Sequence, residues 1–443
     1  MNLTIKKYWP ILLCGMMFFV LHSCASSPDV YAKIDSIVNT GSFENALIPL
    51  YDESGTLHRR LYTPKNLILL YLDRGMINHF AGRYRDSSDD LQTAELLIEQ
   101  AFTKSISQEI GSYILNDNTK DYSGEDYEDL YINIFNSLNY FHSGNSEGAL
   151  VEIRRLNEKL NYLADKYETA AKKVTNSDSH LDTRQLPVEA ARFSNSALAR
   201  YMGLLLYRGT GRNDSARIDY EELFRAYSLA PEVYYHPVPS SVENELAVPS
   251  GKARLNILAF TGLAPVINEQ NILIPLPFAF PNNTARLALP AMVNRANQIE
   301  RAEAVLDTGE IIPLELLEDM GAVARETFKS KYSLTVLKTT ARAIAKVTTS
   351  AGVASYVTER QGRGLGALVG VLGRVLTEAS EQADTRLSRY FPCYALVGGV
   401  NLNPGSYVIT VNFYGRSGLI NSQRREINVR LDKLNLEEFI CLR

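Results

Sequence analysis

The stretch from Tyr127 to Leu160 constrains the fold most, because it has the pattern of two helices joined by a short turn. In the polar segment between them, Gly144 can take the left-handed conformation of a helix end. The apolar positions at helical spacing are Tyr127, Leu130, Tyr131, Ile134, Phe135, Leu138 and Phe141 in the first helix and Ala149, Ile153, Leu156 and Leu160 in the second. One helical hairpin cannot bury such a face alone, so the pattern predicts neighbouring hairpins.

Similar hairpin patterns occur on both sides of this stretch. We expect them at 30–52, 67–100 and 195–231. The second helix of each hairpin carries a small residue where two helices come close, and these residues are Ala46, Ala94, Ala149 and Ala216. Their spacing does not follow the roughly 34-residue period of tetratricopeptide repeats. We therefore predict an array of divergent tetratricopeptide-like hairpins over 24–235.

The first residues have the pattern of a bacterial lipoprotein signal peptide. Lys6 and Lys7 precede an apolar run over 8–21, which is shorter than the ~20 residues that span a bilayer. The run ends at Leu21-His22-Ser23-Cys24, which resembles a lipobox. We expect residues 1–23 to be removed and Cys24 to carry the lipid that holds the protein on a membrane. Ala25, in place of an aspartate, resembles the sorting pattern for the outer membrane and predicts a location on its periplasmic face.

Composition excludes one class of partner and leaves one question about the cysteines open. A net charge of −4 gives no electrostatic reason to bind nucleic acid. Of the four cysteines, Cys14 leaves with the signal peptide and Cys24 is lipidated. The remaining two, Cys393 and Cys441, are either a disulfide in an oxidising compartment or two buried free thiols.

Beyond residue 235 the sequence changes from helical to strand-like periodicity. Several prolines over 231–249 indicate a linker, which we place at 236–250. Short strand-like runs follow, and the alternation over 407–414 is the clearest of them. We predict a β-sandwich over 251–443 that contains a helical insertion at about 314–380. The expected fold class is therefore a multidomain α plus β protein.

Two features of the insertion have more than one interpretation. Lys338, Arg342 and Lys346 form a basic row beside an apolar stripe. This row is either a solvated face, which we favour, or a contact with acidic lipid or an acidic partner. Gly362, Gly366 and Gly370 recur every four residues and favour close packing against another backbone.

Three stretches carry a resemblance to a known family. Tyr122 to Glu128, Ala149 to Arg155, and Ala383-Asp384-Thr385-Arg386 resemble signature stretches of a family of uncharacterised bacterial envelope lipoproteins. The resemblance implies a tetratricopeptide-like N-terminal half and a β-rich C-terminal half, but no activity. Asp384 and Arg386 are either a binding site or, as we favour, a salt bridge that clamps loop backbone.

No catalytic pattern is present in the sequence. The histidines are scattered, and no HExxH, paired CxxC or Gly-x-Ser-x-Gly motif occurs. Four acidic residues over 125–129 favour charges at a helix start rather than a calcium site, because a calcium loop's alternation and glycine are missing. We therefore expect no cofactor, no metal and no enzymatic activity.

Two function hypotheses remain. The first is a membrane-anchored periplasmic scaffold or adaptor, whose helical array offers a concave groove to envelope proteins or peptides. Tyr122 and Tyr140, beside the apolar stripe of the central hairpin, are the expected partner contacts. The second is a hydrolase acting on cell-wall polymer, or its activator, which requires a deep polar cleft with two carboxylates under ~10 Å apart.

Overall fold

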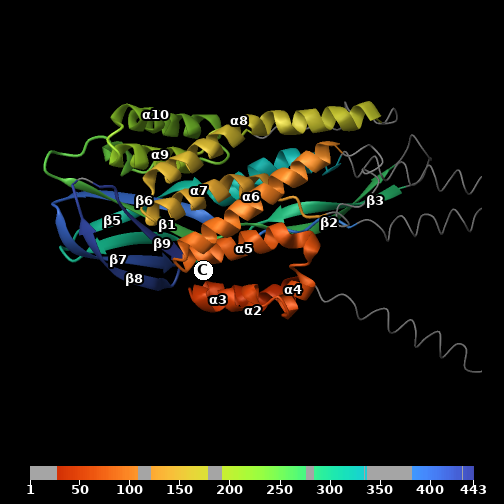
Figure 1. Ribbon diagram of the computed structural model, residues 1–443, viewed down its shortest axis with the longest axis horizontal. Coiled ribbons are helices and arrows are strands. Elements are labelled where there is room, and N and C mark those ends of the chain that lie inside the picture. Colours follow the sequence, from red (N-terminus) through yellow and green to blue (C-terminus); the bar gives the residue numbers. More distant parts are fainter. Residues whose placement is uncertain are drawn as a thin grey trace, which may run out of the picture.

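The computed structural model describes residues 27–107, 121–177, 192–275, 284–333, 335–336, 382–431 and 433–443. Stacked helices lie along one side of a curved sheet (Figure 1). The chain is thus a mixed α and β protein. The expected signal peptide, Cys24, the basic row and the glycine series of the insertion lie outside the described residues. No helix in the described part is both long and apolar enough to cross a membrane.

In the described part of the N-terminal half, the helices form four hairpins. They are α2 (Ser27–Asn39) with α3 (Phe43–Tyr51), α5 (Leu67–Phe80) with α6 (Tyr84–Ser107), α7 (Asp126–His142) with α8 (Ser146–Ser177), and α9 (Ala197–Gly209) with α10 (Asn213–Leu229). A short helix, α4 (Thr56–Arg60), and a 3₁₀ turn, η2 (Pro64–Asn66), join the first hairpin to the second. The hairpins that we expected from the sequence correspond to these four pairs.

The same turn closes every hairpin. Gly41, Gly82, Gly144 and Gly211 all have φ between 75° and 80°. In the central hairpin the N–H of Gly144 donates to Phe141 and that of Asn145 to Tyr140, and the other three turns repeat both bonds. This is a Schellman motif, which caps the last carbonyls of the first helix. The fifth residue after each glycine is small and fully buried, and these residues are Ala46, Ser87, Ala149 and Ala216. For the second hairpin we expected Ala94 at this position. Ala94 is also buried, but Ser87 is the residue equivalent to Ala46, Ala149 and Ala216.

The described residues of the C-terminal half form one seven-stranded sheet and a two-stranded ribbon. In spatial order the sheet is β8 (Gly418–Val429), β7 (Gly405–Gly415), β4 (Arg301–Leu306), β5 (Ile311–Asp319), β6 (Pro392–Leu402), β1 (Ala253–Leu263) and β9 (Asn435–Cys441), and the ribbon is β2 (Val266–Pro275) with β3 (Thr284–Val293). Only β1 and β9 are parallel. Because β5 runs to Asp319 and a helix occupies 320–333, the insertion begins later than the expected residue 314.

The sheet curls so far that its two edge strands approach each other. The side chain of Gln423 on β8 donates to the carbonyl of Ile440 on β9 at 2.7 Å, and Arg425 pairs with Glu437 at 3.1 Å. The curl encloses an apolar core that includes Ile257 and Phe413. The expected sandwich of two facing sheets is therefore not confirmed, because a single sheet folds around its own core.

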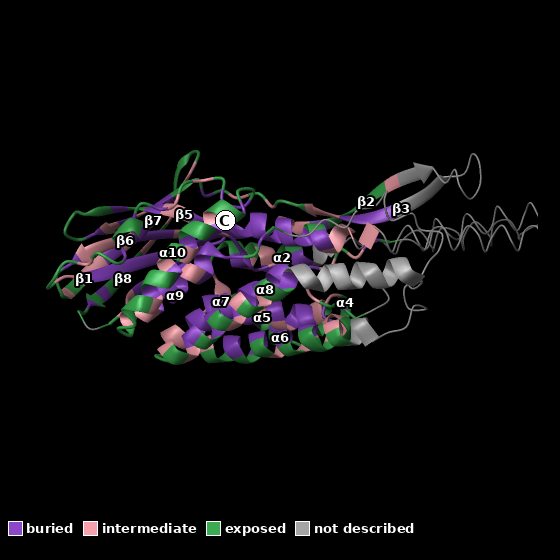
Figure 2. Ribbon diagram, turned by 90° about the horizontal axis from the view of Figure 1, so that it is seen from above, coloured by how far each residue is buried: buried purple, intermediate pink, exposed green. Residues whose placement is uncertain are grey.

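The helices and the sheet share a second, larger core. Strand β1 is buried along its whole length: Leu255 and Ile257 lie inside the curled sheet, whereas Leu258 and Phe260 face the helices. The ring of Phe135 on α7 lies 5.1 Å from that of Phe260. Figure 2 shows exposed residues along the outer side of α6, whereas α5 and α7 are mostly buried. The inner face of the helical array, where we expected an open groove, is thus covered by the chain's own sheet.

Candidate functional site

The boundary between the helices and the C-terminal half contains several buried carboxylates. They are Asp73, Glu128, Glu245, Glu318 and Glu438, each at most 6% exposed. Burying a charge is costly unless it is paired or hydrogen-bonded, so the partners of each group decide its role. The structure provides donors for all five, and most of the donors come from distant parts of the chain.

Glu438 on β9 joins two imidazoles of the helical half. Its Oε1 lies 2.8 Å from Nε2 of His79 on α5, and its Oε2 lies 2.7 Å from Nε2 of His142 on α7. Asn139 contacts Nδ1 of His79 at 2.7 Å, and Tyr84 stacks on His142 with ring centroids 4.5 Å apart. These contacts fix both rings.

The electrostatics of this cluster favour an ion pair. Burial alone would raise the pKa of Glu438, but the charge of His79 and hydrogen bonds from both imidazoles hold that pKa well below its usual value. Burial lowers the pKa of His79, and Glu438 more than reverses this, so the pKa is raised. The contact between Glu438 and His79 therefore connects residues 359 positions apart.

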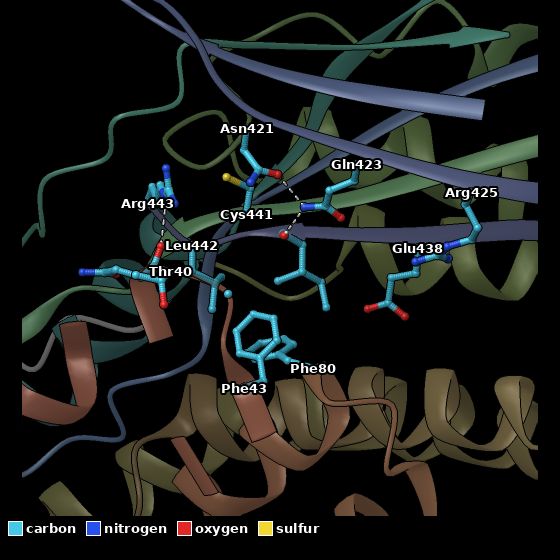
Figure 3. A pocket seen from close by; sticks show the side chains of 13 residues that line it. Thr40, Phe43, Phe80, Asn421, Gln423, Arg425, Glu438, Cys441, Leu442 and Arg443 are labelled. Carbon is cyan, nitrogen blue, oxygen red and sulfur yellow. Dashed lines mark hydrogen bonds between the residues drawn. The ribbon is translucent and has the colours of Figure 1, made fainter. Parts of the chain in front are cut away.

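A cavity of about 270 Å³ adjoins the cluster (Figure 3). It lies between the α2–α3 turn and the edge strands β8 and β9. Figure 3 shows Phe43 and Phe80 on the helical side and Gln423 and Arg425 on the sheet side. Glu438 is the one carboxylate side chain among the described residues that line it. Glycoside hydrolysis requires a pair of carboxylates, and the described lining has only this one. Both of its oxygens already contact imidazoles.

Glu318 is a second junction, at the end of β5. Its carboxylate accepts hydrogen bonds from the hydroxyls of Tyr131, Ser196 and Tyr234 and from the N–H of Leu198, at 2.6 to 3.1 Å. Burial raises the pKa of Glu318, although the hydrogen bonds from these donors oppose the rise. The Glu318 carboxylate therefore joins α7, the start of α9 and the segment after α10 to the end of β5.

The third junction involves an irregular segment, 382–391, which we call the strap. It enters β6 and crosses the helical half. The N–H of Ser388 donates to Oε1 of Glu128 at 2.6 Å, while the Ser388 hydroxyl and the N–H of Arg389 donate to Oδ1 of Asp73 at 2.7 and 2.8 Å. Arg389 also forms an ion pair with Asp35 on α2. The strap therefore contacts α2, α5 and α7.

The expectation that Tyr122 contacts a partner is wrong, whereas the same expectation for Tyr140 stays a prediction. Tyr122 is only 2% exposed and donates its hydroxyl to Glu128 at 2.7 Å, so it is a core residue rather than a groove residue. The apolar pattern did not reveal this, because Tyr122 lies outside the helix. Tyr140 is half-buried and accepts a hydrogen bond from Gln92 at 2.8 Å.

Asp384 and Arg386 form the salt bridge that we favoured. The two side chains lie 2.7 Å apart, the N–H of Arg386 donates to Asp384, and Arg386 donates to Asn66 at 3.0 Å. They anchor the start of the strap. The acidic residues at the start of α7 have a further role, because Glu125 and Glu128 are buried and form a capping box. Sequence spacing alone could not show that the strap covers them.

Cys393 and Cys441 are free and buried, so the disulfide that we left open is not formed. Cys441 pairs with Thr261 on one side of β1, and Cys393 lies on β6 at the other side. Two strand spacings separate their Cα atoms by roughly 10 Å. A disulfide needs less than about 7 Å.

The described residues contain no group of three or more His, Cys, Asp or Glu side chains suited to a metal ion. Their histidine and carboxylate clusters join the two halves of the molecule, and a mixed apolar and polar cavity lies between the α2–α3 turn and the edge strands. No family model, curated protein or solved structure matches the chain.

Proposed function

We propose that this protein is a lipid-anchored scaffold or adaptor on the periplasmic face of the outer membrane. The observation that carries the proposal is the use of its charged groups. The described carboxylates with the strongest burial are occupied by donors from the chain itself, which suits a rigid platform rather than a reaction centre. The signal-peptide pattern supplies the anchor at Cys24.

The described body starts close to the proposed anchor. Helix α2 begins at Ser27, three residues after Cys24. Three residues span at most about 11 Å, so a lipid on Cys24 would hold the first helical hairpin close to the bilayer. We also propose that the array is tetratricopeptide-like. The repeated turn and the buried small residue of all four hairpins support this.

Partners in this proposal bind outside the inner face of the array. The sheet covers the inner helices, which leaves the described outer faces of α6, α8 and α10 and the turns at Gly82, Gly144 and Gly211 accessible. Tyr140, at the end of α7 and half-buried, is the retained contact for an envelope protein or peptide. The alternative of a cell-wall hydrolase gains no support from the cavity, whose lining has a single carboxylate side chain.

The anchor is tested by replacing Cys24 with alanine in the full-length protein. We expect the variant to remain an unprocessed precursor that incorporates no labelled palmitate, whereas Cys393→Ala is processed and labelled normally. A Cys24→Ala protein that still labels and migrates as mature would refute the anchor. Capture of partners from crosslinked envelopes, with Tyr140→Ala as the variant, tests the scaffold: unchanged capture removes Tyr140 as the contact.

A further inference from the structure

Strand β8 becomes polar on its core-facing side where it borders the cavity of Figure 3, which we call the seam cavity. Three of its residues line the seam cavity, and each is paired directly with a fully buried apolar residue of β7: Asn421 with Phe413, Gln423 with Val411, and Arg425 with Ile409. Directly paired residues share one face of a sheet, and here that face encloses the core inside the curl. The β8 side of this core face is therefore polar along the seam cavity, whereas the β7 side is apolar.

The chain itself uses only part of this polarity. The side-chain NH₂ of Gln423 donates to the carbonyl of Ile440 at 2.7 Å and to Oδ1 of Asn421 at 3.0 Å, which joins the two edge strands. Arg425 is neutralised by its ion pair with Glu437. The side-chain NH₂ of Asn421, in contrast, has no acceptor among the described residues. It is therefore available as a hydrogen-bond donor to a bound molecule.

Arg443 supplies a positive charge next to Asn421. Its guanidinium donates to the carbonyls of Asn39 and Ile420, at 2.9 and 3.3 Å, and Ile420 directly precedes Asn421. Among the described residues, no acidic side chain forms an ion pair with Arg443. The backbone oxygen of Arg443 accepts from the N–H of Gln298 at 3.1 Å. A guanidinium has five N–H donors, so two carbonyls leave it with donors and an uncompensated charge for an anion.

The helical side of the seam cavity is apolar. The rings of Phe43 and Phe80 lie with their centroids 5.3 Å apart, and Ile440 and Leu442 line the cavity with them (Figure 3). Glu438, the carboxylate of the described lining, is held by two imidazoles. A volume of about 270 Å³ is just below the range of roughly 300–1,000 Å³ typical of pockets for drug-sized ligands, so the cavity suits a smaller molecule.

We propose that the seam cavity binds a small aliphatic carboxylate, whose carboxylate contacts Arg443 and Asn421 and whose alkyl chain packs on Phe43 and Phe80. A guanidinium fork matches the two oxygens of a carboxylate, and the two rings remove the alkyl chain from water. The bound molecule would contact the α2–α3 turn and both edge strands of the sheet. This site goes beyond the scaffold role and does not depend on it.

Saturation-transfer NMR with hexanoate at pH 7 tests the site. The full-length protein is held in nanodiscs of zwitterionic lipid, and empty nanodiscs give the blank. We expect hexanoate to bind above the blank and each methylene removed to weaken binding about fourfold, so butyrate should bind about fifteenfold more weakly. Hexylammonium keeps the alkyl chain but reverses the charge, and it should bind at least about tenfold more weakly than hexanoate. No binding of hexanoate above the blank, or equal affinities of hexanoate and hexylammonium, would overturn the proposal.

Two variants and one control locate the bound carboxylate. Arg443→Gln removes the positive charge and should weaken hexanoate binding at least about tenfold. The matched control Arg416→Gln removes the same charge from an exposed pair with Glu300 outside the cavity, and it should keep the wild-type affinity. Asn421→Asp keeps the oxygen that accepts from Gln423 but replaces the donor with a negative charge, so it should also weaken binding at least about tenfold. Wild-type affinity in Arg443→Gln, or in Asn421→Asp if the first variant does not fold, contradicts the site.

Discussion

Glu438 and Glu128 are both enclosed at the boundary between the helices and the C-terminal half, yet their pKa values move in opposite directions. Glu438 has two imidazoles in contact, and its pKa is lowered. Glu128 has neutral donors in contact and carboxylates nearby, and its pKa is raised to about 8. Burial opposes ionisation at both places. At Glu438 the contacts with two imidazoles outweigh the effect of burial, whereas at Glu128 the hydrogen bonds from three neutral donors do not.

Removal of the Glu438 carboxylate should have the largest effect. Glu438→Ala leaves His79 buried without its partner, and breaking one side of a buried pair typically costs about 3–5 kcal/mol. Urea denaturation at pH 6 measures the loss. The control is Glu437→Ala, which removes a partly exposed pair with Arg425 and should cost less than about 1 kcal/mol. Equal losses in the two variants would mean that the imidazole cluster adds no stability.

The pH dependence of the free energy of unfolding should reflect the opposite pKa shifts of Glu128 and Glu438. The pKa of Glu128 in the folded protein is raised from 4.5 to about 8. Its contribution to the free energy of unfolding is therefore full below pH 4.5 and declines by up to about 1.4 kcal/mol per pH unit towards pH 8. His79, with a raised pKa, loses its contribution in the same direction above its ordinary value. The lowered pKa of Glu438 makes its own contribution disappear only in acid.

We therefore expect a lower urea midpoint at pH 8 than at pH 6. Glu128→Gln should reduce this difference, while Glu437→Gln, at a partly exposed ion pair with Arg425, should not. A protein that is more stable at pH 8 than at pH 6 would show that Glu128 is ionised in the folded state, and the contrast with Glu438 would be lost.

Helix α7 carries both clusters, with Glu128 in its first turn and His142 at its end. Ala149→Leu should push α8 away from α7, because Ala149 is fully buried, and overpacking typically costs about 1–3 kcal/mol. The exposed neighbour Glu147→Leu should cost less. Thermal melts compare the two. The slope of stability against pH should stay as in the wild type, and a changed slope would mean that α7 is not a rigid support for both carboxylates.

The smallest effect on stability is expected at Tyr140. This side chain is half-buried and its hydroxyl accepts one hydrogen bond from Gln92. We expect Tyr140→Ala to lower the free energy of unfolding by about 1 kcal/mol or less, with partner capture reduced. Tyr122→Ala, which empties a buried site, should lower stability by about 3 kcal/mol or more. Similar losses in both variants would place Tyr140 in the core.

The local features of this protein could be predicted from the sequence. Helix α7 and its turn were expected within a residue or two, because the apolar spacing and Gly144 act on neighbouring residues. The alternation over 407–414 likewise falls within β7. Asp384 and Arg386 were expected to pair because they lie two residues apart. In each case the deciding interactions connect residues that are close in the chain.

Tertiary structure decided everything that depends on distant pairing. Whether a carboxylate such as Glu128 is a solvated helix-start charge or a buried acceptor depends on Ser388, 260 residues away, and the charge of Glu438 depends on His79. The covering of the inner helical face by β1 and the burial of Tyr122 were missed for the same reason. Sequence periodicity shows which face of an element is apolar. Which segment covers that face follows from packing over the whole chain, because burial is favourable against any complementary surface.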